Sequence, residues 1–104
     1  MRLDTLIVTG LVEALRDVVP GGTRLLLHGS RVDDSLKGGD IDLLLVVNDS
    51  DEPGLSPKKH ILLARIKERI GDRRVDLTIA SATETARDPF LKSVLPGALT
   101  LHVF

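Results

Sequence analysis

The chain has 104 residues and a formal net charge of −1, and 42% of its residues are hydrophobic. This length suits a single domain that spans residues 1–104, and the apolar content is high enough for a folded core. The lack of cysteine excludes disulfides and thiolate metal sites. The near-neutral charge provides no general attraction to nucleic acids, although it does not exclude them as partners.

Other features of the composition narrow the class of protein. Asp4, Glu13 and Asp17 interrupt the N-terminal apolar residues, which argues against a signal peptide. The longest uncharged apolar run, residues 43–47, is too short to span a bilayer. We therefore expect a cytoplasmic protein without a membrane partner. Aromatic residues are scarce, with two Phe and no Tyr or Trp, which disfavours a stacking surface for single-stranded nucleic acids.

The first half of the chain is predicted to contain one helix and two strands. In chain order these are a helix over residues 4–19, a turn at 20–22, a strand over 23–27, a loop over 31–39 and a strand over 40–47. The helix is indicated by apolar residues at helical spacing, with Asp4 as N-cap and Gly10 as a weak point. The second strand is apolar on both faces except at Asp40 and Asp42. Such a strand belongs inside a sheet that is covered on both sides.

The second half is predicted to add a long helix, a strand and two short elements. In chain order these are a loop over residues 48–55, a helix from 57 to about 70, a strand over 74–80, a short helix near 89–95, a turn at 96–97 and a terminal strand from 99. Ser56 and Pro57 are typical of an N-cap and a first helical position, and Gly71 of a helix end. The last strand either joins the sheet or offers an edge to a partner.

Acidic residues in two apolar strands indicate a metal site. Asp40 and Asp42 point to the same face of their strand, about 6.5 to 7 Å apart. Burying them is costly unless a positive charge is near, either Lys37 or, better, a divalent cation. Asp76 is a similar lone charge, so three carboxylates converge if its strand lies beside theirs. Carboxylate oxygens select Mg²⁺, or alternatively Mn²⁺, and such clusters suit two-ion phosphoryl chemistry.

The same strands are preceded by a candidate phosphate-binding turn. Gly29 lets the backbone approach a phosphate, the hydroxyl of Ser30 can bond to it, and Arg31 adds a fixed cation. His28, directly before this turn, is a candidate nucleotide contact. Each feature alone is weak, because Gly-Ser is usually a plain turn and Asp-x-Asp usually a solvated loop. Their combination with two apolar strands is more specific.

In this combination the chain resembles the polymerase-β-type nucleotidyltransferase superfamily in its minimal form. The resemblance rests on His-Gly-Ser-Arg (28–31), Gly-Asp-Ile-Asp-Leu (39–43) and Val-Asp-Leu (75–77), and covers roughly residues 20–80. It implies an α/β (α+β) fold, a mixed sheet flanked by helices. It also implies two Mg²⁺ ions and the attack of a hydroxyl on the α-phosphorus of a nucleoside triphosphate, ATP in the first instance.

The resemblance assigns roles residue by residue. Gly29 and Ser30 match the phosphate-binding pair, Asp40 and Asp42 the paired metal ligands, and Asp76 the third carboxylate, which can also assist as a base. Minimal members are often encoded beside a HEPN-type ribonuclease toxin, which they neutralise as antitoxins, in some cases by adding AMP to it. The spacer before Asp40 is one residue shorter than is common. Asp33 and Asp34 would repel a triphosphate unless they point outward.

Several alternatives stay open. The chain could act as a binding module that covers a partner without chemistry, or it could transfer a nucleotide to a small molecule or an RNA 3′ end. The acceptor surface would come from a partner or from a second copy in a homo-oligomer. The basic segment, residues 58–74, is either a binding face or, as we expect, the solvated side of a helix.

Overall fold

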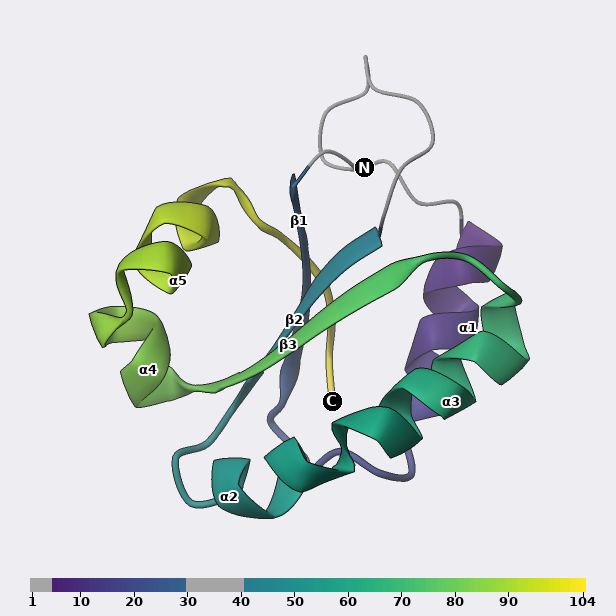
Figure 1. Ribbon diagram of the computed structural model, residues 1–104, viewed down its shortest axis with the longest axis horizontal. Helices are drawn as coiled ribbons and strands as arrows, with labels where there is room; N and C mark the ends of the chain where they lie inside the picture. Colours follow the sequence, from purple (N-terminus) through teal and green to yellow (C-terminus); the bar gives the residue numbers. More distant parts are fainter. Residues whose placement is uncertain (1–4, 30–40) are drawn as a thin grey trace.

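The computed structural model describes residues 5–29 and 41–104, which form a four-stranded mixed sheet flanked by helices on both faces (Figure 1). The predicted fold class, a mixed sheet flanked by helices, is therefore confirmed. The described elements are α1 (Thr5–Leu15), β1 (Arg24–His28), β2 (Ile41–Val47), α2 (Glu52–Leu55), the 3₁₀ helix η2 (Ser56–Lys58), α3 (Lys59–Ile70), β3 (Val75–Ser81), α4 (Ala82–Arg87), α5 (Pro89–Val94), the 3₁₀ helix η3 (Leu95–Gly97) and β4 (Leu99–Val103).

The strand order is β3-β2-β1-β4, with β2 in the interior of the sheet. β2 pairs with β3 in parallel, and β1 pairs with both β2 and β4 in antiparallel orientation. The parallel pair needs a crossover connection, which α2, η2 and α3 supply. β4 pairs with β1 and forms one edge of the sheet. The interpretation that the C-terminal strand joins the sheet is therefore confirmed.

Alternate side chains of β2 enter two separate cores. Leu43 and Leu45 are fully buried on the face that α1 and α3 cover. Leu44 and Val46 are buried on the other face, where they cluster with Leu91 of α5. The expectation that this strand is covered on both sides is thus confirmed. Burial on both faces explains why its apolar run is continuous.

Helix α1 ends at Leu15, four residues before the predicted end. The chain tightens there, because the amides of Val18 and Val19 both donate to the carbonyl of Leu15. Val19 remains buried in the turn that follows, so its apolar character reflects core packing rather than helix. None of the helices in the described ranges combines the length and apolarity needed to cross a membrane.

The predicted loop over 48–55 is wrong at its end, where α2 forms. Pro53 lies in the first turn of α2, where a missing amide costs nothing, and Leu55 is buried. Ser56 does not cap α3; its hydroxyl donates to the carboxylate of Glu52 instead. The N-cap of α3 is Lys58, which makes no side-chain capping bond.

Helix α4 was missed, although the sequence contains its start signal. Ser81 and Glu84 form a capping box in which the Ser81 hydroxyl accepts from the Glu84 amide, 3.1 Å away. The Glu84 carboxylate in turn accepts from the Ser81 amide at 3.0 Å. A serine followed three residues later by glutamate is the expected pattern.

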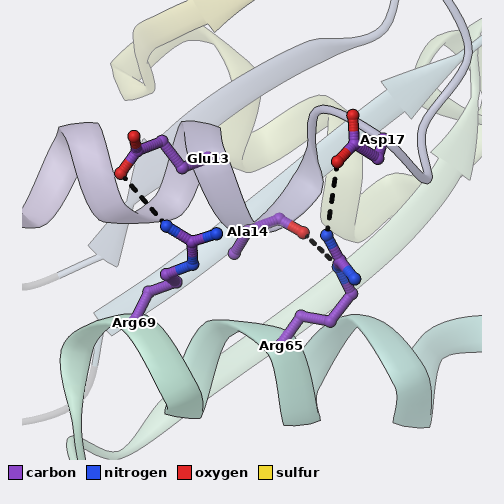
Figure 2. A network of polar contacts seen from close by, with 5 residues as sticks. All are labelled: Glu13, Ala14, Asp17, Arg65 and Arg69. Atoms are coloured by element: carbon purple, nitrogen blue, oxygen red, sulfur yellow. Dashed lines mark hydrogen bonds and ion pairs between the residues drawn. The ribbon is translucent and has the colours of Figure 1, made fainter.

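Part of the basic segment joins α3 to α1 (Figure 2). The Nε atom of Arg65 donates to the carbonyl of Ala14 at 2.6 Å, and its Nη2 atom lies 3.8 Å from the Asp17 carboxylate. Arg69 lies 3.4 Å from Glu13. Both arginines therefore contact α1. Arg65 is half-buried and departs from the expected solvated side, whereas Arg69 remains exposed, as expected.

Gly10 serves the same interface and is more than a weak point in α1. A Cβ atom at this position would lie 2.9 Å from Cγ2 of Ile70, closer than real contacts allow. Glycine at this position lowers the helix propensity of α1, but it allows α1 and α3 to approach closely.

Candidate functional site

Three polar side chains lie next to one another in the register of β1, β2 and β3. His28 is paired with Asp42 across the antiparallel strands, and Asp42 with Asp76 across the parallel ones. We call His28, Asp42 and Asp76 the polar row. The condition on which the three-carboxylate hypothesis depended, that the strand of Asp76 lies beside that of Asp42, is met.

The polar row lies on the sheet face that also carries α4 and α5. Asp42 shares this face with Leu44, and Asp76 shares it with Ala80, because side chains alternate along a strand. Neighbouring strands are about 4.8 Å apart, which brings the two carboxylates close together. Asp42 is half-buried and Asp76 is exposed. The pair is therefore accessible from solvent.

The backbone at Gly29 adjoins the carboxylate of Asp42. Gly29 has a φ of 79°, a left-handed conformation that other residues rarely adopt. A Cβ atom there would lie 2.3 Å from the Oδ2 atom of Asp42. Both the conformation and the close approach favour glycine, so the backbone at the end of β1 lies directly beside the carboxylate of Asp42.

The aromatic ring of Phe90, on α5, contacts the His28 end of the polar row. The ring of Phe90 lies edge-on to that of His28, with the centroids 6.3 Å apart and the planes at 77°. Phe90 is 57% exposed. The sequence did not identify it as a site residue, because nothing in the pattern around residue 90 places it beside β1. His28 was identified only through its position before Gly29.

The other predicted site residues, Ser30, Arg31 and Asp40, lie outside the described residues. Within residues 5–29 and 41–104, no group of three His, Cys, Asp or Glu side chains is arranged to hold a metal ion. Asp42 and Asp76 nevertheless fit Mg²⁺ or Mn²⁺ chemically, because they present carboxylate oxygens side by side on one face. They account for two of the three predicted ligands.

No protein-family model matches the chain, and no curated protein or solved structure matches it significantly.

A hollow of about 260 Å³ lies between α3 and β3, away from the polar row. Leu63, Ile66 and Val75 line it together with the charged groups of Lys67 and Asp72. These apolar residues belong to the core under α1 and α3, on the sheet face opposite Asp42. Lys67 and Asp72 form an ion pair, at 3.2 Å, at the C-terminal end of α3. We assign no catalytic role to this hollow.

Proposed function

We propose that the chain is a magnesium-dependent nucleotidyltransferase that transfers a nucleoside monophosphate, with AMP as the first candidate, from a nucleoside triphosphate to a hydroxyl group. One observation carries the proposal: Asp42 and Asp76 are paired in register, and the Gly29 backbone adjoins Asp42. Carboxylates beside a glycine turn supply both the metal ligands and the phosphate contact that this chemistry needs.

The residues have separate tasks in this reaction. The acceptor oxygen forms a bond to the α-phosphorus, the bond from that phosphorus to the bridging oxygen breaks, and pyrophosphate leaves. Asp76, the more exposed carboxylate of the pair, is assigned to receive the hydroxyl proton. Gly29, Ser30 and Arg31 hold the phosphates. Two Mg²⁺ ions, held by Asp40, Asp42 and Asp76, would neutralise the phosphate charge.

The acceptor in this proposal is a hydroxyl of a partner protein of the HEPN type, which makes the chain an antitoxin. The motivation is the resemblance in residues 28–31, 39–43 and 75–77. Exposed apolar side chains agree with a protein partner: Leu6 on α1 is 81% exposed, and Val103 on the edge strand β4 is 56% exposed. The same two residues also favour the second candidate, a module that neutralises its partner by binding alone.

The test is incubation with ATP labelled at the α-phosphate, Mg²⁺ and a candidate HEPN-type partner protein. We expect wild type to label the partner, and Asp42→Asn or Asp76→Asn to lower the rate by several powers of ten, because each removes a metal ligand. Asp72→Asn is the matched control, since Asp72 is an exposed aspartate paired with Lys67 away from the polar row. Transfer by Asp42→Asn at the wild-type rate would contradict the proposal.

A second measurement separates the two candidates. If a triple variant with Asp40, Asp42 and Asp76 changed to Asn neutralises the partner as well as wild type, binding alone is sufficient and the binding module is correct. If neutralisation is lost while the complex still forms, chemistry is required.

A further inference from the structure

Phe90 is an exposed aromatic ring at the end of the polar row. The chain has two phenylalanines, and the other, Phe104, is partly buried against the core of α1 and α3. Phe90 is 57% exposed, although it lies in α5 beside the buried Leu91. A large apolar ring left in solvent, next to polar groups, suits a flat ligand that covers it on binding.

The position of Phe90 is set by the start of α5. The Asp88 carboxylate accepts from the amides of Phe90 and Leu91 at 2.9 and 3.1 Å and so caps the helix. Leu91 anchors the helix in the core around Leu26 and Leu44. The ring is therefore held on a capped and anchored turn, which lowers the entropy lost when a ligand stacks on it.

The rings of Phe90 and His28 are suited to stacking. They meet edge to face at 77°, so the two rings are not stacked on each other, and Phe90 remains 57% exposed. His28 is the direct neighbour of Asp42 in the sheet, about 4.8 Å across. The centroid of the Phe90 ring lies 6.3 Å from that of the His28 ring. The aromatic pair therefore lies next to Asp42, on the side away from Asp76, where the base of a nucleotide can extend from its phosphates.

We propose that His28 and Phe90 form a stacking platform for the base of the bound nucleoside triphosphate. The inference rests on the proposed function and deepens it, because it assigns the base-binding end of the same site. The scarcity of aromatic residues argued against a stacking surface for single-stranded nucleic acids. A single base, however, requires only one ring. Stacking tolerates any base, so the platform favours purines for their area and discriminates little between ATP and GTP.

The first experiment compares a nucleotide with a probe that has no base. Binding of α,β-methylene-ATP and of inorganic tripolyphosphate, both with Mg²⁺, is measured by calorimetry for wild type, Phe90→Leu and Phe104→Leu. Phe104 is the matched control, because its ring also lies edge-on to a histidine, His102, with the centroids 4.6 Å apart. We expect Phe90→Leu to bind the nucleotide about five- to hundredfold more weakly and tripolyphosphate unchanged. Phe104→Leu should affect neither probe.

The outcomes separate the platform from the proposed function. If Phe90→Leu leaves nucleotide affinity unchanged or weakens both probes equally, the platform is wrong while the nucleotidyltransferase stands. If wild type binds neither probe, both proposals fail together. Thermal melts of each variant show whether a loss of binding reflects a loss of folding.

A second readout detects the contact directly. The chain has no tryptophan, so Phe90→Trp introduces a single fluorophore at the platform. We expect α,β-methylene-ATP to quench its emission and tripolyphosphate to leave it unchanged, whereas Phe104→Trp should respond to neither. Equal responses at positions 90 and 104 would overturn the assignment.

Discussion

Gly29 shows how one residue can connect two parts of the site. Its left-handed backbone disfavours any side chain, and a Cβ atom at this position would also meet the carboxylate of Asp42. From the sequence, Gly29 was expected to let the backbone approach a phosphate. The structure adds a second reason, which is that the backbone must pass directly beside a carboxylate.

Gly29→Ala is expected to lower the free energy of unfolding by at least about 1–2 kcal/mol, because alanine is strained at this φ. Its Cβ atom must also displace the Asp42 carboxylate, so transferase activity should fall further than stability accounts for. Chemical denaturation and α-phosphate transfer measure the two effects. Gly21→Ala is the control: a Cβ atom there meets nothing within 4 Å. An active, stable Gly29→Ala protein would show that the close approach is unimportant.

At the scale of elements, Asp49 attaches α4 to the end of β2. Its carboxylate accepts from the amide of Thr83 at 3.0 Å and from the Thr83 hydroxyl. Chiefly the hydroxyl bond, and then the amide bond, hold the pKa of Asp49 below its ordinary value of 3.8. The contact lies at the opposite end of β2 from Asp42, so it supports the face on which the polar row lies without joining the site.

The pKa of Asp49 predicts a pH-dependent contribution to stability. Because the pKa is lowered on folding, the contribution is fully present above the unfolded pKa of 3.8 and is lost as pH falls through the folded value. Asp49→Asn should therefore melt below wild type at about pH 6, and the difference should shrink below pH ~4. Thr83→Val should behave in the same way. A difference that is constant from pH 6 to pH 2.5 would contradict this account.

At the scale of the whole molecule, β2 connects two cores that share one sheet. Leu43 and Leu44 are both fully buried, on opposite faces, and each belongs to a different cluster. The polar row lies on the sheet that both cores support. The positions of Asp42 and Asp76 therefore depend on packing that is mostly remote from them.

Leu44→Ala is expected to lower the free energy of unfolding by about 2–5 kcal/mol, because it leaves a cavity between β2 and α5. Denaturant unfolding followed by circular dichroism measures the loss. Leu6→Ala serves as control, since Leu6 is 81% exposed and should change stability by less than about 0.5 kcal/mol. If the two variants are equally stable, the face under α5 is not a packed core.

Apolar spacing along the chain was enough to predict the strands and the long helices, because burial imposes this local pattern on each element. The sequence-based predictions missed three local features. These are the helix that contains Pro53 in its first turn, the tightening of the chain after Leu15, and the capping box at Ser81. The pairing of Asp42 with Asp76 and the contact between Phe90 and His28 arise only in the folded chain. Such neighbours are far apart in the chain, and strand order and helix docking, which local patterns do not encode, bring them together.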